Sequence, residues 1–157
     1  QVQRHPLPGR RMKIRPFRAS DARDFLHLVA ELARYEKLKP PTAAAGRRMV
    51  RDIGRRIHVL MAEVDGAAVG YAIYFFTYSS FLARPTLYLE DVFVLSESRG
   101  RGLGKAFFAA LRRVAKKARC GRMEWTVLDW NKPSIRFYKA QGARFMKEWI
   151  LCRLQPP

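Results

Sequence analysis

The sequence is poor in cysteine, histidine and acidic residues, and it has no long hydrophobic run. Its 157 residues include 2 cysteines and 3 histidines, and 13 acidic residues stand against 31 lysines and arginines. The two cysteines, Cys120 and Cys152, are too few for a disulfide framework, so we expect reduced thiols and a cytoplasmic location. The histidines lack the spacing of a metal site, and no apolar run approaches the ~20 residues that span a bilayer. We therefore expect no metal, no membrane partner and no signal peptide.

The scarcity of acids gives the chain a formal net charge of +18. Between Glu97 and Glu124 every charged residue is a lysine or an arginine. Such a run fits a phosphate-rich partner such as nucleic acid, or else a solvated helix face beside a site for one small polyphosphate. The basic residues alternate with core positions and form no separate arm, which favours the second interpretation.

The composition predicts one folded domain. Hydrophobic residues make up 48% of the chain and aromatic residues 12%, which is typical of a globular core. Residues 1–11 show no periodicity, so we interpret them as a disordered extension or a remnant outside the fold, and we expect the domain to span residues 12–157.

Hydrophobic periodicity places the elements of this domain. Helices are expected at 21–39, capped by Ser20, at 42–54, capped by Thr42, at 103–118 and at 133–140, with a stop at Gly142. Strands are expected at 12–17, 57–64, 67–78, 86–95, 122–128 and 145–154, with a hairpin turn at Asp65-Gly66. The order β-α-α-β-β-β-α-β-α-β predicts an α/β fold with a single mixed, strongly twisted sheet and flanking helices.

Two segments carry the functional signal. Arg99-Gly100-Arg101-Gly102-Leu103-Gly104 follows a strand and opens a helix, where backbone N–H groups and the helix dipole favour a pyrophosphate or another anion. About thirty residues on, the chain reads Trp130-Asn131-Lys132-Pro133-Ser134-Ile135-Arg136-Phe137-Tyr138, followed by Gln141-Gly142-Ala143.

Together with the Tyr-Leu-Glu-Asp strand at 88–91, these segments resemble the GCN5-related N-acetyltransferase superfamily, within it the spermidine/spermine and thialysine acetyltransferase branch. Glu31-Leu32-Ala33-Arg34-Tyr35-Glu36 and Tyr74-Phe75-Phe76-Thr77-Tyr78 also carry the resemblance, which covers nearly all of residues 12–154. It implies the acetyl-CoA N-acyltransferase fold. The implied reaction is direct transfer of an acetyl group from acetyl-CoA to a primary amine in a ternary complex, without an acyl-enzyme.

The resemblance implies a set of residues that bind acetyl-CoA. The glycine loop fits the pyrophosphate, and the strand before it splays from its neighbour so that the pantetheine arm pairs with freed backbone groups. One of those N–H groups could also stabilise the oxyanion of the tetrahedral intermediate. The expected cofactor-binding residues are Val92, Phe93, Val94, Arg99, Gly100, Arg101, Gly102, Gly104, Lys105, Asn131 and Ser134.

The resemblance also implies the catalytic residues. Tyr138 occupies the position of the family's general acid, which protonates the departing thiolate. Glu90 is the expected base for the amine, directly or through a water. Asp91 would face the opposite side of a regular strand, but a bulge could bring both acids toward the cleft. The amine-binding residues are expected to be Tyr35, Glu36, Tyr78, Phe81 and Asp91.

The net charge of the chain limits which amines are expected as substrates. A chain at +18 repels a polycation, and the segment after Tyr78 contains no acid before Arg84. We therefore expect a lysine-like amine with its own carboxylate rather than spermine. The expected last strand at 145–154 could be exchanged or paired between subunits, as the resemblance implies, so we expect a homodimer. Two alternatives are a protein lysine or N-terminal acetyltransferase and a nucleic-acid-binding protein on a degenerate acetyltransferase fold.

Overall fold

The computed structural model describes residues 11–157, so the predicted extension lies outside the described residues except for Arg11. The backbone N–H of Arg11 donates to the Asp65 carboxylate over 2.9 Å, and the Asp65 N–H donates back to the Arg11 carbonyl over 3.0 Å. The described chain divides into two units, one that ends at Trp125 and one that spans Thr126–Pro157.

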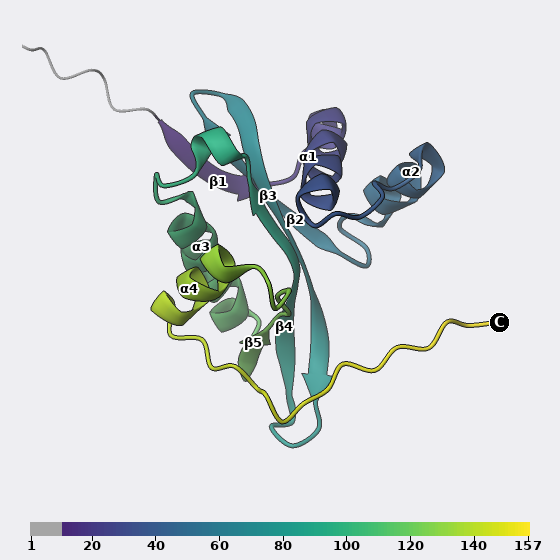
Figure 1. Ribbon diagram of the computed structural model, residues 1–157, viewed down its shortest axis with the longest axis vertical. Helices are drawn as coiled ribbons and strands as arrows, with labels where there is room; N and C mark the ends of the chain where they lie inside the picture. Colours follow the sequence, from purple (N-terminus) through teal and green to yellow (C-terminus); the bar gives the residue numbers. More distant parts are fainter. Residues whose placement is uncertain (1–10) are drawn as a thin grey trace, which may run out of the picture. The chain divides into compact units, whose positions relative to one another are not determined.

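The first unit is built around a five-stranded sheet (Figure 1). In spatial order the strands are β1 (Met12–Pro16), β2 (His58–Val64), β3 (Ala67–Ser79), β4 (Arg84–Val94) and β5 (Arg122–Glu124). The first four are antiparallel, and β5 is parallel to β4. The turn between β2 and β3 has positive φ at Asp65 and Gly66, 51° and 83°, as a two-residue type I′ hairpin requires. The predicted mixed α/β sheet is confirmed.

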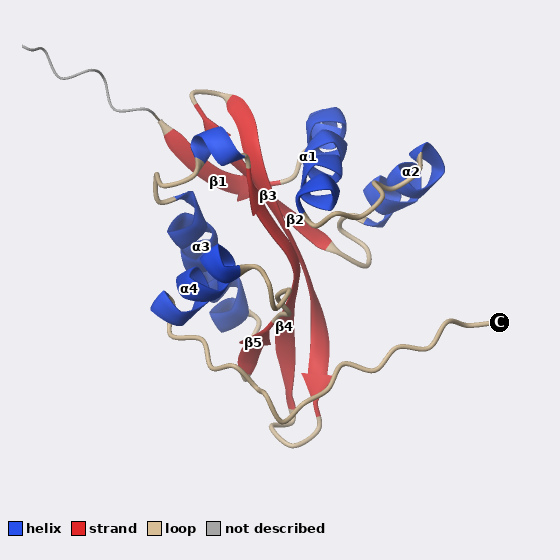
Figure 2. Cartoon of the chain, viewed as in Figure 1, coloured by secondary structure: helices blue, strands red, loops and turns tan. Residues whose placement is uncertain are grey.

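Three helices of the first unit cover the two faces of this sheet (Figure 2). Helices α1 (Ala22–Tyr35) and α2 (Ala43–Asp52) lie on one side, and α3 (Leu103–Lys117) lies on the other. Thr42 caps α2 as predicted, because its hydroxyl accepts the Ala45 N–H over 3.2 Å. The face of α3 predicted from its periodicity buries Leu103, Phe107 and Leu111, whereas Val114 and Ala118 are only half-buried.

The face under α1 holds an aromatic core. Phe25 of α1 meets Tyr71 of β3 edge-on, with ring centroids 5.3 Å apart, and both side chains are fully buried. Phe17 contacts the other side of Phe25, with centroids 5.7 Å apart, and Phe93 of β4 lies beside Tyr71. Burial of these rings fixes α1 against β3 and β4.

A buried ion network fixes the start of α1 to the sheet edge. The Arg15 guanidinium donates to both carboxylate oxygens of Asp21 over 2.7 Å and to Glu63 of β2. Asp21 also accepts the Arg18 N–H over 2.7 Å, which winds a 3₁₀ turn at Ala19–Asp21. Ser20 therefore lies inside this turn, and the prediction that it caps the first helix is wrong. Asp21 occupies that N-cap position instead.

The second unit contains α4 (Lys132–Ala140) and no strand among its described residues. The predicted strand at 145–154 is wrong for this chain, because an extended segment becomes a strand only when a neighbour accepts its backbone hydrogen bonds. Its apolar side chains are exposed instead: Trp149, Ile150, Leu151 and Leu154. The predicted strand at 122–128 is shortened to Arg122–Glu124, since β5 pairs only with Thr86–Tyr88 of β4.

Arg15→Met is expected to lower the free energy of unfolding by about 3 kcal/mol, because it leaves the carboxylates of Asp21 and Glu63 without their counter-charge. Chemical denaturation at pH 7 measures this. Arg34→Met is the matched control, since Arg34 forms an exposed pair with Glu31, and we expect a cost below about 1 kcal/mol. Equal costs for the two substitutions would contradict the assignment.

Candidate active site

The glycine loop takes the geometry predicted for an anion site. A short 3₁₀ turn at Ser96–Ser98 follows β4, and α3 begins at Leu103. Gly100 and Gly102 have φ of 73° and 84°, which side chains with a Cβ rarely adopt. Gly102 is the N-cap and offers no side chain to cap the helix. The first N–H groups of α3 therefore lack an intrahelical acceptor and can bind an anion.

The side chain of Arg99 leaves this loop. Its Nε donates to the carbonyl of Val94 over 2.8 Å, and its guanidinium lies 5.0 Å from the ring centroid of Tyr35 and 5.5 Å from that of Phe93. Arg101 and Lys105, also predicted to bind the cofactor, are exposed at the loop and at the start of α3. All three basic residues are thus exposed, and the guanidinium of Arg99 also lies against Tyr35 of α1.

Strand β4 contains a bulge at Glu90. Ile73 of β3 pairs with Asp91, and the next residue, Tyr74, pairs with Leu89, so Glu90 is the extra residue. The bulge changes the phase of the strand, because Tyr88 before it and Asp91 after it face the side covered by α1. Glu90 is exposed and Asp91 is half-buried. The bulge considered from the sequence is therefore present at the two predicted acids.

Beyond the bulge, β4 has no neighbouring strand on one side. Its pairing with β5 ends at Tyr88, whereas its pairing with β3 continues to Val94. The backbone of Val92, Phe93 and Val94 is therefore free of β5, as the predicted splay requires. Phe93 packs its ring into the core, so any contact of this residue with a ligand belongs to its backbone.

Asp91 is the most perturbed carboxyl group of this region. Burial and the nearby Glu90 and Glu36 carboxylates raise the pKa of Asp91 to about 6. The Tyr71 hydroxyl opposes this rise, because it donates a hydrogen bond to Asp91 Oδ2 over 3.0 Å. Tyr71 itself is fully buried, and burial raises its pKa well above the ordinary value, so it remains a neutral donor.

Glu36 completes a group of three acids. It follows the last residue of α1, and burial raises its pKa. Glu36 and Glu90 both act electrostatically on Asp91. The charge around Asp91 is therefore negative although the chain as a whole is strongly basic, and the raised pKa of Asp91 makes it a better proton acceptor than an ordinary aspartate.

Tyr78 and Phe81 do not join this group in the chain. Tyr78 pairs with Pro85 near the tip of the β3–β4 hairpin, and Phe81 at the tip is fully exposed. Asp91 lies six residues along β4 from Pro85, which is roughly 20 Å at the rise of an extended strand. Their predicted role in amine binding has no support from this geometry.

The second unit holds the other predicted residues. Asn131 caps α4, since its side-chain oxygen accepts the Ser134 N–H over 3.3 Å, and a proline occupies the first turn as predicted. Gly142 has a φ of 86°, which suits the predicted helix stop. Tyr138 is buried in α4. The roles of Asn131, Ser134 and Tyr138 toward the cofactor and the thiolate stay predictions.

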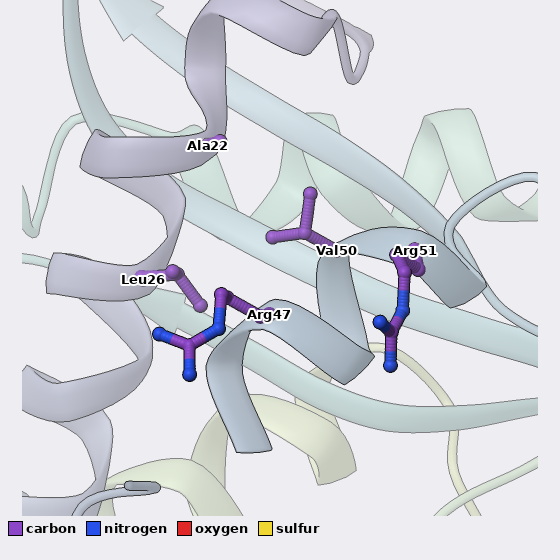
Figure 3. A pocket seen from close by; sticks show the side chains of 5 residues that line it. All are labelled: Ala22, Leu26, Arg47, Val50 and Arg51. Carbon is purple, nitrogen blue, oxygen red and sulfur yellow. The ribbon is translucent and has the colours of Figure 1, made fainter. Parts of the chain in front are cut away.

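Other features of the described chain offer no further chemistry for this site. A groove between α1 and α2 is lined by Ala22, Leu26, Arg47, Val50 and Arg51 (Figure 3), none of which is acidic or nucleophilic. His58 stacks on Tyr74, with ring centroids 5.1 Å apart, which is a packing role. Within residues 11–157, no group of His, Cys, Asp and Glu could hold a metal ion, and no helix is long and apolar enough to cross a membrane.

Sequence reasoning missed Tyr71. The residue looks like an ordinary member of an apolar strand, and only the pairing of β3 with β4, which sets Ile73 opposite Asp91, brings its hydroxyl to Asp91. A hydroxyl on the buried face of a strand is the one signal that could have pointed to it.

The sequence model of the acetyltransferase (GNAT) family matches residues 23–143. Thialysine N-epsilon-acetyltransferase from Mus musculus is 33% identical over 157 residues, covering 91% of this chain and 92% of that protein. L-ornithine N5-acetyltransferase NATA1 from Arabidopsis thaliana is 43% identical over 90 residues, which are 57% of this chain and 40% of that protein. The alignment thus spans less than half of NATA1.

The fold matches solved structures as well. The aminoglycoside N-acetyltransferase AAC(6')-Iy in complex with CoA superimposes with a TM-score of 0.78 at 24% identity, covering 99% of this chain and 100% of that chain. At this level of identity the likeness concerns the fold.

Tyr71→Phe is expected to raise the pKa of Asp91 above its value of about 6. The Tyr71 hydroxyl stabilises the ionised carboxylate through its hydrogen bond, and the substitution removes that bond. Carboxyl-carbon NMR titration measures it. Tyr88→Phe, on the same face of β4, is the control and should leave that pKa unchanged. An unchanged pKa in Tyr71→Phe would show that the hydroxyl does not act on Asp91.

Proposed function

Since the chain belongs to the acetyltransferase (GNAT) family, we propose that it transfers the acetyl group of acetyl-CoA to the side-chain amine of a small, lysine-like molecule. The observation that carries this proposal is the group of acids at the β4 bulge, beside a glycine loop shaped to bind an anion. The amine would bind as a cation and must lose a proton before it attacks, and the raised pKa of Asp91 supports Asp91 as the acceptor of that proton.

The residues near the bulge fit acetyl-CoA. The N–H groups at the start of α3, with Gly100, Gly102 and Gly104 in or next to the loop, would hold the pyrophosphate, and Arg101 and Lys105 would add positive charge. On the side of β4 that β5 leaves open, backbone groups of residues 92–94 other than the Val94 carbonyl, which accepts from Arg99, would pair with the amides of the pantetheine arm. The co-substrate supplies a thioester, whose acetyl carbon is activated toward an amine.

The proton balance assigns a task to each group. Asp91 takes the proton of the ammonium, with Glu36 and Glu90 holding the cation through their charge. The amine nitrogen then forms a bond to the acetyl carbon, and the carbon–sulfur bond breaks. The thiolate leaves with a proton from Tyr138, whose position in the Asn-x-Pro-Ser-x-x-Phe-Tyr segment supports this role. The acetylated nitrogen gives its remaining extra proton to the Tyr138 phenolate, and Asp91 releases its proton to solvent, so the products are the neutral amide and the free thiol. Asp91 replaces Glu90 as the proposed base because it is the buried acid with the raised pKa.

The charge of the chain supports an amino acid substrate. A net charge of +18 repels a polyamine, whereas an amino acid with a side-chain amine carries a compensating carboxylate. The mouse relative is named for thialysine and the Arabidopsis relative for L-ornithine. The exposed positions of Lys105, Arg112, Arg113, Lys116 and Lys117 on α3 support the interpretation of a solvated helix face. The two free cysteines fit a cytoplasmic location.

Thiol release from acetyl-CoA is expected with thialysine, ornithine or lysine and much less with spermidine. Tyr138→Phe should lower the release at least tenfold, because the phenol no longer protonates the leaving thiolate. The control is the no-amine reaction, run for both proteins. Faster turnover of spermidine than of the amino acids would contradict the substrate class, and an unchanged rate in Tyr138→Phe would remove the general acid.

We also propose that the enzyme is a homodimer. The exposed apolar side chains at Trp149, Ile150, Leu151 and Leu154 lie in an extended segment that a second copy could cover by adding backbone hydrogen bonds. Light scattering should therefore give the mass of two chains. A variant in which all four residues are replaced by serine should give the mass of one chain. A monomeric mass for the unaltered chain would overturn the proposal.

A further inference from the structure

Arg99 connects three parts of the first unit. It belongs to the glycine loop, its Nε donates to the carbonyl at the end of β4, and its guanidinium lies against the ring of Tyr35, the last residue of α1. Phe93 forms the second ring contact. A guanidinium over aromatic faces is an attractive contact, which the exposed side chain of Arg99 makes at the surface of the protein. Tyr35, Phe93 and Arg99 also line one cavity, of about 620 Å³.

The contact between Arg99 and Tyr35 connects the residues proposed to bind the amine with the loop proposed to bind CoA. Tyr35 precedes Glu36 in the sequence, and Phe93 lies two residues after Asp91 on the same face of β4. Glu36 and Asp91 belong to the group of acids proposed for the amine, whereas Arg99 begins the loop proposed for the pyrophosphate. The end of α1 and the loop are thus in contact through one side chain.

We propose that Arg99 is a positioning residue, which sets the glycine loop for CoA by packing on Tyr35 rather than by binding phosphate itself. The affinity for CoA then depends on the aromatic face of Tyr35, a residue of the amine side of the site. This inference rests on the proposed use of acetyl-CoA.

The alternative is a direct bond from Arg99 to phosphate. In that case loss of Arg99 weakens CoA binding, but loss of the Tyr35 ring does not, and the two substitutions are independent. If Arg99 acts through Tyr35, both substitutions remove the contact between the two side chains. The double variant then binds CoA with the same affinity as the single variant that has the larger effect.

Calorimetric titration with CoA tests the proposal on the full chain. Tyr35→Leu keeps an apolar side chain but removes the ring, and it should raise the Kd for CoA about twofold to fivefold. Tyr35→Phe keeps the ring and should restore the original Kd. Arg99→Ala should raise the Kd at least as much, because it also removes the Phe93 contact and the bond to the Val94 carbonyl. The double variant Arg99→Ala with Tyr35→Leu should raise the Kd no further than Arg99→Ala alone.

Arg101→Ala is the matched control from the same loop, since Arg101 is a basic and exposed residue two positions along the chain from Arg99. Its effect on the Kd should add to that of Tyr35→Leu. An unchanged Kd in Tyr35→Leu, or additive effects of Tyr35→Leu and Arg99→Ala, would overturn the positioning role. No CoA binding by the unaltered chain would instead overturn the proposed function, and the inference with it.

Discussion

The site depends on one irregularity in the sheet, the bulge at Glu90 in β4. Asp91 pairs with Ile73 and lies on the α1 side of the sheet with Phe93, where its side chain meets the hydroxyl of Tyr71. The bulge leaves Glu90 as the extra residue and brings Tyr88 to the same side of the sheet. Strand β4 loses its β5 neighbour after Tyr88. The half-buried acid and the free strand edge therefore both lie next to the bulge.

Burial and charge give this acid its chemistry. The chain carries 31 basic and 13 acidic residues, so a carboxylate at the surface would usually find a cation. Asp91 is held instead beside Tyr71 and two other carboxyl groups, and the pKa is raised to about 6 as a result. Such an acid is ionised at neutral pH, attracts a cation and accepts a proton more readily than a solvated aspartate.

Local patterns predicted most of the fold. Periodicity located the helices, and turn and cap chemistry located Asp65-Gly66, Thr42 and Gly142, because these depend on residues close in sequence. Non-local pairing was not predictable in the same way. The segment at 145–154 was expected to be a strand but pairs with no strand among residues 11–157. Asp21, not Ser20, begins the first helix, and its partner Arg15 also binds Glu63, which is 48 residues away in the sequence.

The residues of the candidate site also divide into those that local sequence predicts and those that depend on non-local packing. The glycine loop and the acids at 90 and 91 are visible as motifs, whereas the hydroxyl of Tyr71 and the direction of the Arg99 side chain follow from packing. The most direct measurement is kcat/KM for the amine in Asp91→Asn beside Glu90→Gln. The account predicts a loss of about 100-fold or more for Asp91→Asn, the share of a general base, and a much smaller loss for Glu90→Gln. A near-normal Asp91→Asn enzyme, with the large loss in Glu90→Gln, would contradict it.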